Sequence, residues 1–169
     1  MPKWFGLLVA ALFLLPGTAL ADGLPAPTGD VILTITGEVT KTNSGDAADI
    51  DRAMLEALPQ QVIVTQTPWH EGEVTFEGPL LSGIMELVGG SGEYAAVTAL
   101  DDYSVEVPVS DFAEHGPILA LKTNGEYMPE DDKGPLFIIY DYDGKPGLNT
   151  EDYHSRSVWS VRRIELQAD

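Results

Sequence analysis

Aromatic and cationic side chains crowd together near the C-terminus, in residues 153–166. Arg156, Arg162 and Arg163 lie there beside Trp159, in a chain whose formal net charge is −18. An arginine next to a tryptophan can present a planar charged group and a flat apolar face to one ligand. The same residues also suit a terminal strand whose solvated arginines neutralise an acidic surface. Taken by itself, this stretch favours the second interpretation.

The other residues able to do chemistry form no recognisable catalytic or metal-binding pattern. His70, His115 and His154 are the only histidines, and their spacing is not that of metal ligands, so we expect them on the surface or in turns. Residues 141–152 are rich in aspartate, but Pro146 stands where a calcium loop needs its sharp-turn glycine. We expect a solvated acidic loop there, with a loosely bound cation as the alternative. The chain has no cysteine, which excludes a cysteine nucleophile and a thiolate metal site.

The N-terminus has the pattern of a secretory signal peptide. Lys3 precedes the apolar residues 4–15, and Ala19-Leu20-Ala21 is a small-residue cleavage site. We therefore expect cleavage after Ala21 and a periplasmic protein that does not span the membrane, since the apolar run is too short for a comfortable span. The strongly acidic charge argues against nucleic acid or an anionic membrane surface as a partner.

Short strands and two modest helices must position the candidate residues. Alternating or apolar patterns predict strands over 31–39, 61–67, 73–77, 94–100, 103–109, 118–123 and 136–140. Helices are expected from an Asp49 cap through Leu58 and over residues 79–88, with loops over 40–48 and 141–152. Asn124-Gly125 predicts a type I′ hairpin. We expect a signal peptide over 1–21, a flexible leader over 22–30 and one α+β domain over 31–169.

Several short motifs together resemble the sulfite-oxidase-fold molybdopterin-binding family. They are Trp69-x-x-Gly72, Phe76-Glu77-Gly78-x-x-Leu81, Asn124-Gly125-x-x-Met128-Pro129, Gly134-Pro135-Leu136 and Arg156-Ser157-Val158. The resemblance covers about residues 31–166 and implies mixed β-sheets with a few peripheral helices. It also implies a pterin pocket formed by loops around residues 65–72, 124–134 and 155–159.

Two departures from the family bear on function. Catalytic relatives carry a molybdenum-ligating cysteine just upstream of a tryptophan, where this chain has Thr65 or Thr67. A threonine hydroxyl is a poor substitute for a soft thiolate. Catalytic relatives also often have Arg-Ser-Val-Lys, whose cations hold the cofactor phosphate, and here the last residue of that motif is Trp159. Both changes favour the stacking of a plain, non-molybdenum pterin over the binding of molybdopterin.

The resemblance therefore implies a set of cofactor-binding residues. Trp69 and Trp159 are expected to stack on the ring, Arg156 to donate to a ligand oxygen, and Thr67 and Ser155 to supply hydroxyl contacts. Each has a plain structural alternative: core filling for Trp69, strand packing for Trp159, and pairing with the acidic loop for Arg156. No catalytic residue and no metal ligand is predicted.

Three functions from different classes follow. The first is a non-catalytic periplasmic pterin-binding protein, which the resemblance suggests is a ligand-sensing partner of a membrane signalling protein. The second is a molybdopterin-dependent oxidoreductase, or a subunit of one, with unusual metal ligation. The third is an interaction scaffold that has lost the pocket. We expect the first.

Overall fold

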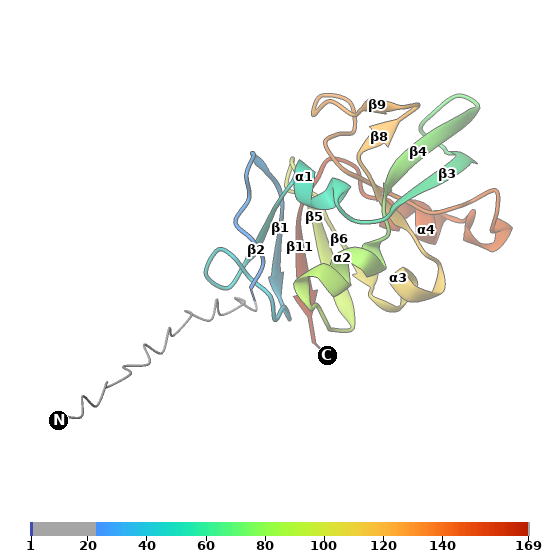
Figure 1. Cartoon of the computed structure of the whole chain (residues 1–169). Helices are drawn as coiled ribbons and strands as arrows, with labels where there is room; N and C mark the ends of the chain where they lie inside the picture. The colour runs from blue at the N-terminus through green and yellow to red at the C-terminus, as the bar shows by residue number, and fades with distance from the viewer. Residues whose placement is uncertain (2–22, 169) are drawn as a thin grey trace.

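The computed structural model describes Met1 and residues 23–168, so the predicted signal peptide lies outside the described residues except for Met1. The larger sheet has five strands in the order β2 (Ala48–Asp51), β1 (Val31–Gly37), β11 (Val161–Gln167), β5 (Tyr94–Ala99) and β6 (Ser104–Pro108). Strands β1 and β11 are parallel, and the other pairs in this sheet are antiparallel. The C-terminal strand therefore lies at the centre of the sheet (Figure 1).

A second sheet of four strands lies beside the first, in the upper right of Figure 1. Its order is β3 (Gln60–Gln66), β4 (Glu73–Pro79), β8 (Lys122–Thr123) and β9 (Glu126–Tyr127). Asn124 and Gly125 connect β8 to β9 with φ values of 51° and 85°, as the predicted type I′ turn requires. Both sheets, with their few helices, confirm the expected α+β class.

A short antiparallel ladder joins the two halves, formed by β7 (Ile118–Ala120) and β10 (Phe137–Ile139). Both strands are buried on both faces. Leu119 and Ile138 belong to the core under the five-stranded sheet, whereas Ile118 and Phe137 belong to the core under the four-stranded sheet. Gly78 in β4 makes this arrangement possible, because a Cβ there would lie 2.1 Å from the carbonyl oxygen of Leu119.

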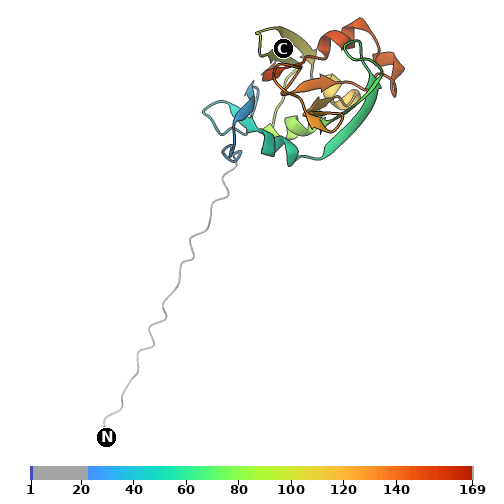
Figure 2. The same cartoon turned by 90° about the horizontal axis from the view of Figure 1, so that it is seen from above.

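Four α-helices lie at the periphery of the described residues: α1 (Arg52–Glu56), α2 (Leu81–Val88), α3 (Ser110–Glu114) and α4 (Glu151–Arg156). Helix α2 ends at Val88, as the sequence predicted, and Gly89 follows in the left-handed conformation. Figure 2 shows the same arrangement from above, with the N-terminal strands at the left and the strands of the second sheet at the right. Within the part of the chain that the structure describes, no helix has the length and apolar composition to cross a bilayer.

The structure differs from the sequence-based expectation in several elements. The expected strand 118–123 is divided between β7 and β8, which belong to different sheets. Residues 48–51 form β2, and Asp51 rather than Asp49 caps α1 by accepting from the backbone nitrogen of Met54 at 2.9 Å. The expected loop 141–152 runs into a helix, α4, whose first turn carries Glu151 and Asp152 and whose last turn carries Arg156. That charge order complements the helix dipole and so stabilises α4.

Residues 23–30, expected to belong to a flexible leader, are attached to the five-stranded sheet. The Asp51 carboxylate accepts hydrogen bonds from the backbone nitrogens of Thr28 and Gly29 at 2.6 and 2.8 Å, and the Leu24 side chain is buried. These backbone hydrogen bonds, that from Met54 foremost, lower the pKa of Asp51 to about 2. The same carboxylate thus caps α1 and anchors the segment before β1.

Candidate functional site

The turn that follows β3 presents Trp69. Thr67 shapes this turn: its Oγ1 accepts from the backbone nitrogen of Trp69 at 3.3 Å and lies 2.8 Å from Nδ1 of His70. Burial, together with the nearby charge of Lys133, lowers the pKa of His70, which favours the neutral imidazole. Thr67 itself is buried and supports the turn from below.

Trp159 approaches from the other side, between α4 and β11. Ser157 fixes the end of α4, because its hydroxyl donates to the carbonyl of Tyr153 at 2.9 Å and also contacts the hydroxyl of Tyr142. Ser160 then takes a positive φ of 52°, and its carbonyl accepts from the backbone nitrogen of Leu100. The chain changes direction at this point, and the Trp159 side chain is left 42% exposed.

The two indoles meet although they are 90 residues apart in the chain. Their ring centroids are 5.6 Å apart with an interplanar angle of 69°, an edge-to-face arrangement. Phe137 of β10 lies against both rings, at 5.5 Å from Trp69 and 6.2 Å from Trp159. The ladder between the sheets therefore supports the aromatic cluster from the inside.

A pocket of about 440 Å³ opens at this cluster, and we call it the indole pocket. Its aromatic lining residues are Trp69, Tyr103 and Trp159, and its small apolar ones are Ala99 and Val158. Its polar lining residues are Asp101, His154, Ser155 and Ser157. No lysine or arginine is among these nine described lining residues. The pocket thus offers flat apolar faces and neutral or acidic polar groups, a combination suited to an uncharged or cationic heterocycle.

Several polar groups of the pocket are already held by local hydrogen bonds. The Ser155 hydroxyl donates to the carbonyl of Asp152 at 2.6 Å, one turn back along α4. Nε2 of His154 lies 3.1 Å from Oδ1 of Asn149, and the Asp101 carboxylate accepts from the backbone nitrogen of Tyr103 at 3.1 Å. These contacts fix the side chains that a ligand would meet, which lowers the entropic cost of binding.

Arg156 does not line the indole pocket, contrary to its expected role as a ligand donor. Its Nη1 donates to Oδ2 of Asp111 at 2.8 Å, and its guanidinium lies 4.9 Å from the ring centre of Tyr153. Asp111 is buried in α3 and also accepts from the hydroxyl of Tyr140 at 2.9 Å. A buried carboxylate needs a cation nearby, and Arg156 supplies it.

This ion pair also affects the ionisation of its neighbours. Burial, and then the negative charge of Asp111, raise the pKa of the Tyr140 hydroxyl well above its usual range. Burial opposes the charge of Arg156, yet the hydrogen bond to Asp111 leaves the pKa of Arg156 raised. Both groups therefore keep their protons at neutral pH, and the cluster docks α4 onto α3 rather than facing a ligand.

Of the five predicted site residues, Trp69, Trp159 and Ser155 line the indole pocket, Thr67 supports the turn that carries Trp69, and Arg156 lies in the ion pair with Asp111. The sequence reasoning missed His154, Asp101 and Tyr103, which the structure adds to the lining. His154 lies two residues before Arg156, where the family motif begins, and this position could have indicated its place in the lining. The two strands of the β5–β6 hairpin were predicted, but nothing in the sequence placed their connection at the pocket.

Neither threonine that stands in the region of the family cysteine is free to bind a metal. Thr65 is fully buried, and its Oγ1 accepts from the backbone nitrogen of Asp143 at 3.2 Å. Thr67 makes the turn contacts described above. Among the described residues, no three His, Asp or Glu side chains lie close enough to hold a metal ion. A hydroxyl at this position does not supply a soft ligand of the kind that molybdenum prefers.

A larger groove of about 720 Å³ lies elsewhere, between residues 28–32, α1 and residues 128–130. Its described lining contains no aromatic ring, so a flat heterocycle would find no stacking partner there. The indole pocket is therefore the better candidate for a ring-shaped ligand.

Comparison with protein-family models gives one relevant match. The model described as "Oxidoreductase molybdopterin binding domain" matches residues 28–167, which include every element of the structure. A search of curated proteins finds no match to this chain.

Proposed function

The chain belongs to the oxidoreductase molybdopterin-binding domain family, and on that premise we propose that it binds a pterin without metal-dependent catalysis. The observation that carries the proposal is the pair of indoles, Trp69 and Trp159, that meet at 5.6 Å on the indole pocket. A pterin is a flat bicycle with polar edges, which suits aromatic faces surrounded by donors and acceptors. The volume of about 440 Å³ lies within the usual range for small-ligand sites.

The polar lining supports a plain pterin over the phosphate-bearing molybdopterin for which the family is named. A phosphate is best held by arginine, lysine or a helix N-terminus. The described lining residues of the indole pocket supply no cation, and Asp101 adds a negative charge there. Hydroxyls and the His154 imidazole remain to recognise the ring edge. The chain has no cysteine thiolate to bind molybdenum, and the described lining has no cation to bind a phosphate. Both observations favour a plain pterin.

We further propose that the protein acts in the periplasm as a ligand-sensing partner of a membrane signalling protein. The exposed rings of Tyr103 and Trp159, 57% and 42% accessible, support this because they stand at the pocket where a partner could detect an occupied site. The net charge of −18 favours a partner with a basic docking face. Affinity capture from membranes, with and without added tetrahydrobiopterin, tests this part of the proposal.

Mass spectrometry of small molecules released from protein purified out of its native compartment tests the ligand class. We expect a pterin in near-stoichiometric amount, and molybdenum far below one atom per chain by elemental analysis. Stoichiometric molybdenum would contradict the proposal and favour an oxidoreductase. Recovery of no pterin, together with no response to added biopterin or tetrahydrobiopterin, would leave an interaction scaffold.

A further inference from the structure

One edge of the four-stranded sheet is formed by β3, and it lacks most of the protection that exposed edges usually carry. Only its last residue, Gln66, is covered, by the carboxylate of Asp143. Edge strands are normally protected by charges, proline or short length, because their free backbone groups can pair with another chain. In the described residues, β2 carries Asp49 and Asp51 at its edge, β6 carries Glu106 and Pro108, and β9 has only two residues, one of them Glu126. Strand β3 has seven residues and no charge.

The backbone groups of Val62 and Val64 are the ones that face outward. The backbone N–H of Gln66 donates to Oδ2 of Asp143 at 2.7 Å. The N–H of Gln66 therefore points away from β4. Residues two and four positions earlier in a strand point the same way. Pairing with β4 therefore uses Gln61, Ile63 and Thr65, whereas the N–H and C=O groups of Val62 and Val64 face away from the sheet.

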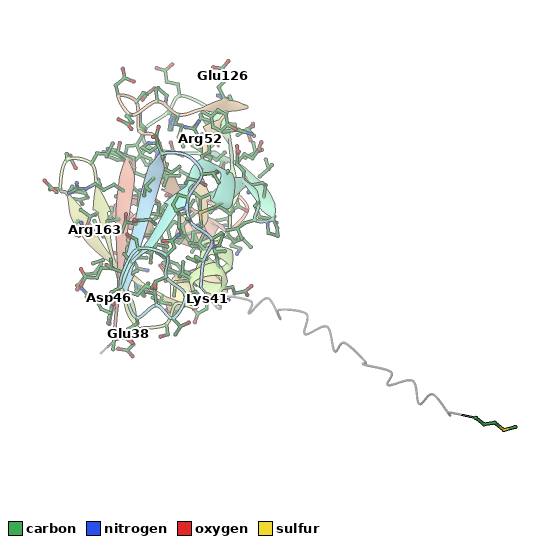
Figure 3. All side chains as sticks on the ribbon, turned by 60° about the vertical axis from the view of Figure 1, so that its left-hand side comes forward. Glu38, Lys41, Asp46, Arg52, Glu126 and Arg163 are labelled. Atoms are coloured by element: carbon green, nitrogen blue, oxygen red, sulfur yellow. The ribbon has the colours of Figure 1, made fainter. Side chains whose placement is uncertain are left out.

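The side chains on this strand are also exposed and apolar. Val62 is 58% and Val64 50% accessible, whereas Ile63 between them and Thr65 after them are buried. Charged side chains extend from both ends of the molecule, with Arg52 and Glu126 at one end and Glu38, Lys41 and Asp46 at the other (Figure 3). Strand β3 has no charged side chain, which is unusual for an exposed strand of a chain with a net charge of −18.

The sequence of β3 is nearly symmetric about Ile63: Gln60-Gln61-Val62-Ile63-Val64-Thr65-Gln66. When two copies run antiparallel about a two-fold axis at Ile63, Val62 lies opposite Val64 of the other copy, and Gln60 lies opposite Gln66. Val62 and Val64 are the residues with outward N–H and C=O groups, so each such pair can exchange two hydrogen bonds. A two-fold interface requires this kind of self-complementary surface.

We propose that β3 pairs with β3 of a second copy of this chain, which forms a homodimer with one continuous sheet across the interface. Net charge opposes any contact between two copies of charge −18, and β3 adds no charged side chain of its own to that repulsion. The pairing covers the exposed valines of both copies and satisfies their outward backbone groups. It is independent of the ligand, since neither valine lines the indole pocket.

Sedimentation equilibrium across a micromolar to millimolar concentration series tests the dimer. The parent protein is expected to dimerise, and added NaCl should strengthen the association because it screens the repulsion between the copies. Val64→Pro removes an outward N–H without removing a hydrogen bond to β4, and Val64→Lys adds a charge to the edge. Both variants should raise the dissociation constant at least tenfold. Val31→Lys, at an exposed valine of β1, is the matched control and should leave it unchanged.

Register is tested by cross-linking, since the chain has no cysteine of its own. Opposed Cα atoms in a hydrogen-bonded pair are about 5.5 Å apart, within disulfide range, whereas diagonal neighbours are about 7–8 Å apart. An equimolar mixture of Val62→Cys and Val64→Cys should therefore oxidise to dimers several-fold faster than either variant alone.

The proposal fails if the parent stays monomeric throughout the series or if salt weakens the association. It also fails if folded Val64→Pro and Val64→Lys dimerise like the parent, or if the mixed cysteine variants cross-link no faster than each alone. Circular dichroism establishes that each variant is folded. The Lys variant, which leaves the backbone unchanged, keeps the test valid if the Pro variant does not fold.

Discussion

Replacing Trp159 with alanine should weaken pterin binding by roughly 30-fold, and the estimate follows from the exposure of the ring. The side chain is 42% accessible, which for a tryptophan of up to about 250 Å² leaves about 100 Å² open. A flat ligand that covers half of this area removes about 50 Å² from water, worth about 1.2 kcal/mol. Ring stacking adds about 0.5–1.5 kcal/mol. The sum of about 2 kcal/mol corresponds to roughly 30-fold in affinity.

Isothermal titration calorimetry with biopterin and tetrahydrobiopterin measures this loss, because fluorescence would change with the removal of an indole. Trp159→Phe is the matched control: it keeps a flat ring and should retain most of the affinity. The exposed position of Trp159 implies little loss of fold stability, which a thermal melt checks. An alanine variant that folds normally and binds within twofold of the parent would refute the assignment of the indole pocket.

Arg156→Ala should leave pterin affinity unchanged but lower the free energy of unfolding by about 2 kcal/mol in urea titrations, because its buried carboxylate partner loses a charged hydrogen bond. Because the folded-state pKa of His70 lies below its unfolded value, stability should fall as pH drops through about 6.5, and His70→Gln should flatten that slope. Gly78→Ala should cost about 1–3 kcal/mol, since the new methyl group meets the backbone of β7.

Each of these variants has its own control. Arg163→Ala removes an exposed arginine of β11 and should be nearly neutral, so equal losses at both arginines would contradict the role given to the ion pair. Gly83→Ala places a methyl group in open space on α2 and should stabilise slightly. A stability slope for His70→Gln that matches the parent would show that the proton is bound elsewhere.

Local patterns were enough to predict most of the strands and the turn at Asn124-Gly125, because alternation and turn chemistry act over a few residues. The order of the strands could not be predicted in this way, and the missed strand β2 exists only because β1 pairs with it. The meeting of Trp69 and Trp159 followed from the family resemblance and not from their spacing.

The ion pair of Arg156 could not be predicted for a similar reason. Its partner Asp111 is 45 residues away in the chain. No local pattern indicates that this carboxylate is buried and requires a cation. His154 was likewise expected on the surface or in a turn. Its ring joins the lining of the indole pocket only when α4 has formed and packed against the rest of the fold.

The ladder of β7 and β10 has a consequence for how the protein unfolds. Its residues belong alternately to the two hydrophobic cores, so neither core can open without exposing the other. We therefore expect a single cooperative transition in calorimetry, in place of two separate melting events. Phe137 of β10 contacts both indoles of the indole pocket. A ligand bound there should therefore raise the melting temperature of both halves together.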